Sequence, residues 1–198
     1  YNGVALISRT PLEDVRMGFS AELVDDAEAE ELGAQKRVIS ALIDGVRVVN
    51  LYVPNGSSLS SDKYSFKLTW LSCLERYLRA IQTRDEPLCV MGDFNIGLDA
   101  KDLPDPDRLT GGIMASDRER NALKAALGPD LQDAFRLFEP NSGHWSWWDY
   151  RSGAWDRDRG WRIDHIYLNE TLRELARSCS IDKEERGRIQ PSDHAPEG

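Results

Sequence analysis

Four short polar clusters in this 198-residue chain contain the residue types that bind hard cations and transfer protons. Each cluster stands at the end of an apolar, strand-like run or in the loop after it, where a rigid scaffold commonly presents catalytic groups. Carboxylate and amide oxygens suit Mg²⁺ or Mn²⁺, and a histidine adds a proton-transfer partner. The clusters are Tyr52-x-Pro54-Asn55-Gly56, Gly92-Asp93-Phe94-Asn95, Arg162-Ile163-Asp164-His165 and Ser192-Asp193-His194.

These clusters also have a structural interpretation. Gly92-Asp93-Phe94-Asn95 and Ser192-Asp193-His194 have the composition of ordinary polar turns. Asp164 is harder to explain in this way, because an aspartate in an apolar strand destabilises the strand unless the carboxylate has a partner. The four aspartates between residues 99 and 107 are expected to lie in a solvated loop. A zinc site is not expected, because no cysteines stand at ligand spacing.

Tryptophans are concentrated in one segment of the chain. Five of the six lie between Trp145 and Trp161, and four arginines are interleaved with them or follow directly. Large aromatic side chains most often fill a core. Aromatic side chains beside arginines also form surfaces that stack bases and bind phosphates. Both interpretations stay open on composition alone.

The overall composition excludes several classes of protein. A hydrophobic fraction of 40% and a charged fraction of 30% exclude a disordered, collagen-like or coiled-coil chain. No apolar run approaches the roughly 18 residues of a membrane helix. The net charge of -9 excludes nucleic-acid binding by bulk charge, so a polyanion needs a local basic patch or a metal. Three scattered cysteines indicate a reducing compartment.

The elements expected to carry the clusters are strands covered by helices. Two β-rich runs at 36–43 and 46–53 flank Asp44-Gly45, a strong β-hairpin signal. Leucines recurring every three or four positions predict an amphipathic helix over 62–83. Further strands are expected at 3–8, 88–91, 145–150, 161–168 and 178–183, and further helices at 116–127 and 171–178. This pattern predicts one α+β domain built on antiparallel sheet.

Taken together, the clusters resemble the exonuclease III family of apurinic/apyrimidinic (AP) endonucleases, within the endonuclease/exonuclease/phosphatase superfamily. The match extends from Tyr1-Asn2-Gly3-Val4-Ala5 to Ser192-Asp193-His194-Ala195-Pro196. The aspartate-asparagine and serine-aspartate-histidine motifs are shared across the superfamily. Three motifs point to its DNA-repair branch: the tyrosine turn at 50–56, Trp147-Trp148-Asp149-Tyr150-Arg151 and Gly160-Trp161-Arg162-Ile163-Asp164.

The resemblance implies a four-layer α/β sandwich within one domain that spans residues 1–198. Two mixed, mainly antiparallel sheets would pack face to face, with helices outside and the active site at one end. The family starts with a strand that carries a metal-site asparagine, followed by a strand whose glutamate is the principal Mg²⁺ ligand. It also closes with a further strand. We therefore expect this chain to be incomplete at both ends, and residues 1–198 alone to be catalytically inactive.

The resemblance also implies a role for each catalytic residue. Asp93 would orient or deprotonate the attacking water, and Asn95 would donate to the oxyanion of the transition state. His194 would bind the phosphate, with Asp164 fixing its tautomer. Tyr52 would hydrogen-bond the phosphate or assist the leaving group.

The cofactor and the DNA would be bound by overlapping sets of residues. Mg²⁺, or Mn²⁺ in its place, would be held by Asp93, Asn95, Asp193 and His194. DNA backbone would be held by Arg37 and Asn55. A flipped-out abasic sugar would lie against Trp147 and Trp161.

The function implied by the resemblance is Mg²⁺-dependent hydrolysis of DNA phosphodiesters, both at abasic sites and from 3′ ends of double-stranded DNA. The enzyme would act as a monomer in the cytoplasm and would bind no membrane. Two alternatives stay open. One is a superfamily phosphatase or phosphodiesterase acting on a phospholipid or inositol phosphate, and the other is an inactive DNA-binding fragment.

Overall fold

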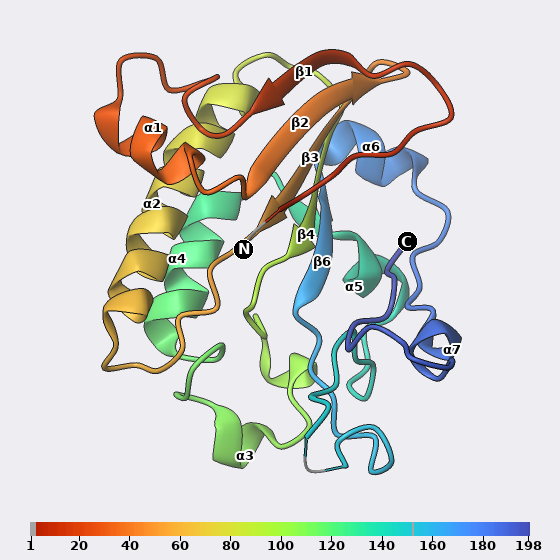
Figure 1. The fold of residues 1–198 in the computed structure, drawn as a ribbon. Helices are drawn as coiled ribbons and strands as arrows, with labels where there is room; N and C mark the ends of the chain where they lie inside the picture. Colours follow the sequence, from red (N-terminus) through yellow and green to blue (C-terminus); the bar gives the residue numbers. More distant parts are fainter. Residues whose placement is uncertain (1–2, 152) are drawn as a thin grey trace.

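A computed structural model describes residues 3–151 and 153–198, and within them six strands form one mixed sheet (Figure 1). The strand order is β1-β2-β3-β4-β6-β5. β3 and β4 run parallel, whereas every other neighbouring pair is antiparallel. The strands are β1 (Glu13–Met17), β2 (Val38–Ile43), β3 (Val46–Tyr52), β4 (Leu88–Asp93), β5 (Gln132–Asp133) and β6 (Asp164–Leu168).

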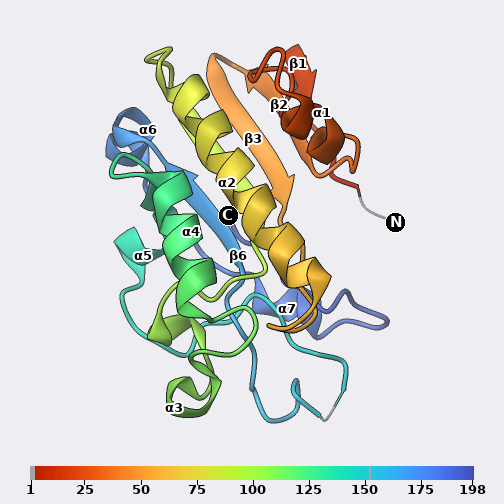
Figure 2. The ribbon, with the colours of Figure 1, turned by 90° about the vertical axis from the view of Figure 1, so that its left-hand side faces the viewer.

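Two long helices, α2 (Asp62–Gln82) and α4 (Asp117–Leu127), cover one face of this sheet (Figures 1 and 2). Ser61 caps α2 by accepting from the Tyr64 amide, and Ser116 and Glu119 form the capping box of α4. The shorter helices are α1 (Ala27–Gly33), η1 (Ala100–Asp102), α3 (Pro106–Leu109), α5 (Ala134–Phe138), α6 (Glu170–Leu175) and α7 (Lys183–Arg186).

The hairpin and the long amphipathic helix predicted from the sequence are confirmed. Asp44 and Gly45 both adopt positive φ, at 51° and 82°, as a tight two-residue hairpin turn requires. Trp70, Leu74 and Leu78 of α2 are fully buried in the core that the helices form with the sheet. Each such side chain contributes about 1.5–3 kcal/mol through burial. The core therefore fixes the sheet firmly against α2 and α4.

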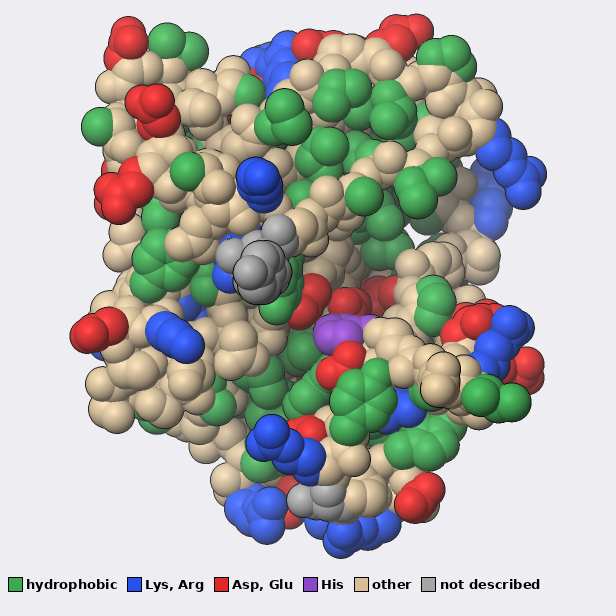
Figure 3. Space-filling view, in the orientation of Figure 1, with side chains coloured by type: hydrophobic (Ala, Val, Ile, Leu, Met, Phe, Trp, Pro, Cys, Tyr) green, Lys and Arg blue, Asp and Glu red, His purple; other side chains and the backbone are tan. Residues whose placement is uncertain are grey.

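The opposite face of the sheet is only partly covered. Residues of β3 alternate along the strand, so that Val49 and Leu51 are buried while Val46 and Val48 are half-buried. Figure 3 shows apolar side chains gathered over the upper part of this face. Within the described ranges, no helix combines the length and apolar character needed to cross a membrane.

Three predicted strands are wrong, and the second sheet expected from the resemblance is not present among the described residues. Residues 3–8 run extended across the sheet face, where the Ala5 carbonyl accepts from Asn50 Nδ2 at 2.8 Å. Residues 145–150 contribute only isolated bridges, from Trp147 to Trp161 and to His194, and residues 178–183 contribute one from Ile181 to Glu197. A strand needs consecutive hydrogen-bonded partners, which apolar or aromatic composition alone does not supply. Tyr1 and Asn2 lie outside the described residues.

A buried histidine on β6 predicts a pH-dependent stability. His165 is 1% exposed, its Nε2 lies 3.3 Å from the Arg162 carbonyl, and Tyr167 Oη lies 2.7 Å from its Nδ1. Burial, followed by the Arg162 charge, lowers its pKa to about 4, against the opposing influence of Asp133 and Asp102. Between this value and the usual 6.5 the unfolded chain binds the extra proton, so acidification destabilises the fold.

We expect this histidine to cost the wild type roughly 2 kcal/mol of unfolding free energy between pH 7 and pH 5. Urea unfolding at the two pH values measures the loss, and His165→Gln should lose correspondingly less. His144→Gln, at a half-buried histidine that pairs with Glu139 rather than with β6, provides a control for loss of a histidine elsewhere in the chain. Equal losses in the wild type and His165→Gln would contradict the assignment.

Candidate active site

Three of the expected catalytic side chains form a row across adjacent strands. Tyr52 at the end of β3 pairs in register with Asp93 at the end of β4, and Asp93 pairs with Asp164 at the start of β6. All three point to the sheet face opposite the long helices, because Val49, Leu51 and Tyr167, which point to the other face, are buried in the core. The strand register thus fixes the spacing of the three side chains.

The turn after β4 depends on Gly92 and Asn95. Gly92 has a φ of +136°, and a Cβ there would lie 2.0 Å from the Leu51 carbonyl oxygen, so a side chain is excluded. Asn95 adopts a φ of 50°, which asparagine tolerates well. Its backbone N–H donates to Asp93 Oδ1 at 2.8 Å, and its side-chain amide donates to Asp93 Oδ2 at 2.9 Å. Asn95 therefore fixes the orientation of the Asp93 carboxylate.

The Asn95 amide has two other partners. Nδ2 also donates to the Val53 carbonyl at 3.0 Å, and Oδ1 accepts from Asn55 Nδ2 at 2.9 Å. Donation by Asn95 to a transition-state oxyanion, the role implied by the resemblance, would require the exchange of one of these bonds. The Asn55 turn and the Asn95 turn are thereby joined side chain to side chain.

His194 reaches the row from the far end of the chain. Its Nδ1 lies 2.7 Å from Asp164 Oδ2, the contact predicted from the sequence. Ser146, which is fully buried, connects the two segments that carry this pair. Its Oγ accepts from the Asp164 N–H at 3.0 Å, and its carbonyl accepts from the N–H of Ala195, the residue after His194, at 2.7 Å. No sequence pattern points to Ser146, because only the fold brings these segments together.

The charges of this cluster perturb one another. Burial, followed by the nearby Asp164, raises the pKa of Asp93 to about 7, although His194, the Asn95 N–H and Lys67 oppose the rise. Burial disfavours the charged form of His194, but its hydrogen bond to Asp164 and the surrounding carboxylates outweigh burial and raise its pKa to about 9. A carboxylate that titrates near neutral pH beside a charged imidazole can accept and pass on protons.

One cleft of about 390 Å³ is lined by Tyr52, Asp93, Asp164 and His194, together with Asn50 and the extended segment at residues 3–5. Figure 3 shows a histidine among acidic side chains in a hollow of this face. A neighbouring cavity of about 510 Å³ is lined by Arg37, Tyr52 and Asn55. The Arg37 guanidinium lies 4.7 Å from the centre of the Tyr52 ring, so the two cavities share the tyrosine.

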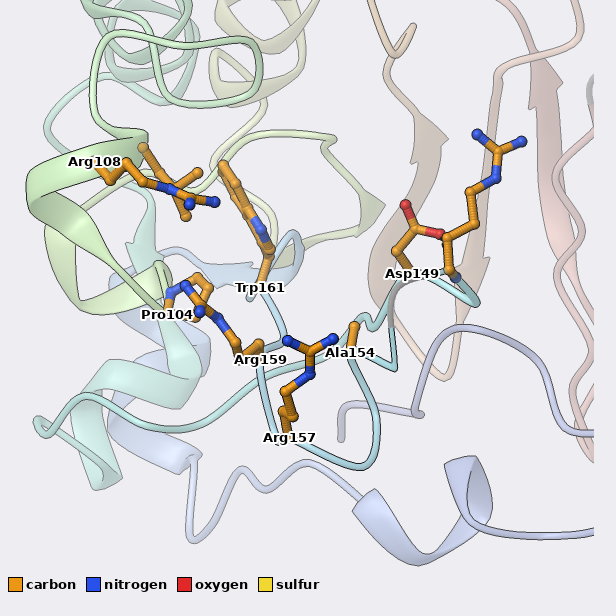
Figure 4. Close-up of a pocket in the computed structure, with 9 residues that line it drawn as sticks. Pro104, Arg108, Asp149, Ala154, Arg157, Arg159 and Trp161 are labelled. Atoms are coloured by element: carbon orange, nitrogen blue, oxygen red, sulfur yellow. Dashed lines mark hydrogen bonds between the residues drawn. The ribbon is translucent and has the colours of Figure 1, made fainter.

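The two tryptophans expected to line a sugar pocket are placed differently. Trp147 Nε1 donates to Asp193 Oδ2 at 2.9 Å, and its ring centre lies 6.5 Å from that of His194. Trp161 lines a separate cavity of about 290 Å³. In Figure 4 arginines from two segments gather around Trp161. The arginines that line this cavity are Arg108, Arg151, Arg157 and Arg159.

The cleft offers some, but not all, of the side-chain donors that a metal ion would need. Nowhere in the described part of the chain are three or more His, Cys, Asp or Glu side chains grouped to hold one. Asp93 presents a half-buried carboxylate beside a second acid, Asp164, and Mg²⁺ commonly binds through one or two carboxylates and keeps waters. Asp193 bonds Trp147 through only one oxygen, whereas Asn95 and His194 are hydrogen-bonded to Asp93 and Asp164. Of these residues, Asp93 beside Asp164 has the paired carboxylates that suit a hydrated hard cation.

One expectation about the aspartates from 99 to 107 is wrong. Asp102 is 1% exposed and accepts from Arg162 at 2.9 Å and from Arg136 at 2.6 Å. These arginines outweigh the desolvation of the carboxyl and lower its pKa to about 2. Asp102 therefore anchors the loop before α3 to the start of β6, which composition alone could not show.

Comparison with known proteins gives consistent matches. Residues 1–194 match the endonuclease/exonuclease/phosphatase family. An exodeoxyribonuclease of Bacillus subtilis is 32% identical over 197 residues, which cover 99% of this chain and 73% of the relative.

Two solved structures are also similar. The 3′ phosphatase NExo from Neisseria, bound to a product DNA hairpin, is 36% identical with a TM-score of 0.87, over 96% of this chain and 71% of that one. An AP endonuclease from Archaeoglobus fulgidus is 33% identical with a TM-score of 0.83, over 94% and 70% of the two chains.

Proposed function

The chain belongs to the endonuclease/exonuclease/phosphatase family, and from that premise we propose that it is a metal-dependent hydrolase of DNA phosphodiesters. It would act at abasic sites and at 3′ ends of duplex DNA. The exodeoxyribonuclease, the DNA-bound 3′ phosphatase and the AP endonuclease among its relatives support this choice of substrate. The observation that carries the proposal is the in-register row of Tyr52, Asp93 and Asp164, completed by His194.

Asp93 is the group we assign to the attacking water. Asn95 holds both of its oxygens, so the carboxylate is oriented before substrate arrives. Its pKa, raised to about 7, suits a general base that works near neutral pH. In this role Asp93 orients the water and takes its proton as the new bond to phosphorus forms.

His194 and Tyr52 are assigned to the phosphate. Because Asp164 occupies Nδ1 of His194, the Nε2–H of the ring is left to donate to a phosphate oxygen. The raised pKa keeps this imidazole charged at neutral pH, which favours an anionic partner. Tyr52, on the other side of Asp93, is placed to hydrogen-bond the phosphate or the leaving oxygen.

We further propose that Asp93 and Asp193 are the side chains that hold Mg²⁺ or Mn²⁺, with Asn95 and His194 beside them. Such a cation supplies positive charge to the phosphate oxygens. It also explains how a protein with a net charge of -9 can act on a polyanion. The residues themselves provide the proton acceptor, the imidazolium and the phenol described above.

DNA would be held on both sides of the cleft. Arg37 and Asn55, in the cavity that shares Tyr52, would contact the phosphate backbone. Trp147 and Trp161 would contact the displaced sugar and its neighbours, with the arginines around Trp161 supplying positive charge. These arginines favour DNA over a phospholipid or inositol phosphate, for which an apolar or lysine-rich loop would be expected.

The finer features of the resemblance are part of the same proposal. The half-buried apolar positions of β3 support a second sheet packed on that face, within one domain. We propose that the enzyme acts as a monomer in the cytoplasm.

The proposal is tested with the protein in its full natural length, incubated with duplex DNA that carries one abasic site, a recessed 3′ hydroxyl or a 3′ phosphate. We expect Mg²⁺- or Mn²⁺-dependent cleavage of at least the abasic duplex, and its complete loss in EDTA. A phosphoinositide offered in parallel should not be hydrolysed. Cleavage that persists in EDTA, or activity on the lipid phosphate alone, would contradict the proposal.

A further inference from the structure

A fully buried ion pair lies beneath the two turns that carry Asn55 and Asn95. Lys67 of α2 and Glu119 of α4 both have side chains with 0% exposure, and Lys67 Nζ lies 2.6 Å from Glu119 Oε1. We propose that this pair is a positioning device, which holds the Asn55 and Asn95 turns in the relative placement that orients Asp93. The inference rests on the proposed function and extends it to residues that lie outside the cleft.

Lys67 spans both turns. Besides Glu119, its ammonium donates to the Asn95 carbonyl at 2.8 Å and to the Asn55 carbonyl at 3.2 Å. An ammonium has three N–H donors, and the three acceptors here come from three separate segments of the chain. Movement of either turn would therefore leave a buried donor or acceptor without its partner, at a cost.

Glu119 is held in place by further hydrogen bonds, and it thereby fixes the position of the Lys67 ammonium. Its Oε1 also accepts from the Met114 N–H at 3.1 Å, and its Oε2 accepts from Ser116 N–H at 3.1 Å and Oγ at 2.6 Å. Ser116 Oγ lies 2.8 Å from Tyr64 Oη, on the same helix as Lys67. The glutamate is thus held by the start of α4, and it anchors the ammonium.

The pair is connected to Asp93 through Asn95. The Asn95 carbonyl is held by Lys67, while the N–H groups of the same residue hold both Asp93 oxygens. The Asn55 turn is also connected to Asn95, because Asn55 Nδ2 donates to Asn95 Oδ1. Three hydrogen-bonded steps therefore lead from the carboxylate of Glu119 to that of Asp93.

Stability alone gives little reason for such a pair. Replacing a buried ion pair by well-packed apolar side chains is often neutral or stabilising, because desolvation offsets most of the attraction. Another buried cation, Arg47 of β3, pairs with Asp14 and Glu86 at the opposite end of that strand from Tyr52. Lys67 differs in that two of its three partners are backbone groups of site turns.

The test compares Lys67→Met with Arg47→Met, which also removes a buried cation but lies far from the cleft. In the Mg²⁺ assay on abasic duplex, we expect Lys67→Met to lower kcat by about 10- to 100-fold with KM changed less than threefold. Arg47→Met should keep kcat within threefold at a temperature where both variants are folded. Lys67→Arg, which keeps the charge and the donors, should recover most of the lost kcat.

A second readout does not depend on the reaction. In ¹H–¹⁵N spectra of the DNA-free protein, the side-chain amide signals of Asn55 and Asn95 should shift in Lys67→Met and stay in place in Arg47→Met. If the wild type cleaves no substrate, the proposed function fails, while these signals still decide the positioning role. Lys67→Gln replaces Lys67→Met if the latter does not fold, with the same expectations. Wild-type kcat with unmoved signals in the folded variant would overturn the inference.

Discussion

An Asp93→Asn enzyme is expected to cleave abasic-site DNA about 10²–10⁴-fold more slowly than the wild type, the range for loss of a proton-transfer group. The substitution keeps the shape of the side chain but removes the base and the negative charge. Asn95 can still donate to the remaining oxygen, so the turn after β4 should survive. The fall should appear in kcat, because the DNA contacts assigned to Arg37 and Asn55 are untouched.

The same substitution should change the free energy of unfolding little. Burial and the neighbouring Asp164 both disfavour the charged carboxylate, as its raised pKa indicates, so removing the charge offsets the loss of one of the two bonds from Asn95. Single-turnover rates and thermal unfolding measured on one preparation separate the two effects. Asp85→Asn, at an exposed loop position, provides the control with full activity. Activity within tenfold of the wild type in Asp93→Asn would show that the base is another residue.

Removal of the His194 imidazole is expected to have an effect of similar size. His194→Ala should lower the cleavage rate by about 10²–10⁴-fold, because the phosphate loses a charged donor. Asp164→Asn should lower it less, since the ring remains but loses the carboxylate that fixes its tautomer and raises its pKa. The double variant should be little slower than His194→Ala alone, because the two residues act as a unit.

Rate measurements on the two single variants and the double variant, at saturating DNA, check this expectation. His144→Ala is a suitable control, since that histidine pairs with Glu139 and does not line the cleft. Multiplicative losses in the double variant would mean that Asp164 acts independently of His194. A direct role for Asp164 in binding the cation would be one such independent action.

The sequence predicted the parts of the site that depend on local pattern. The hairpin at Asp44-Gly45 and helix α2 follow from turn chemistry and apolar periodicity, and both are confirmed. The Asp164–His194 contact was predicted from the resemblance, and the structure places the two side chains 2.7 Å apart. The family is also confirmed, because its motifs lie at strand ends and turns, where the residue types themselves carry the signal.

The features that sequence could not supply depend on partners distant in the chain. Residues 145–150 are rich in aromatic residues, as strands often are, yet pairing needs a continuous neighbour that this segment lacks among the described residues. The segment around Asp102 has the composition of a solvated loop, but Asp102 is buried and forms ion pairs with Arg136 and Arg162. Ser116 and Glu119 stand at the spacing of a capping box, which is a local pattern, whereas Lys67, the partner of Glu119, stands 52 residues earlier in the chain.

The row across β3, β4 and β6 has a consequence for how the protein folds. The parallel pair β3–β4 cannot close as a hairpin: α2 must cross over before Tyr52 meets Asp93. Asp164 and then His194 join from still later in the chain, so each contact of the cleft has a large sequence separation. Contacts of this kind carry a high loop-closure entropy and form late. A chain still in the course of folding, including one on the ribosome, therefore has no assembled cleft with which to cut DNA.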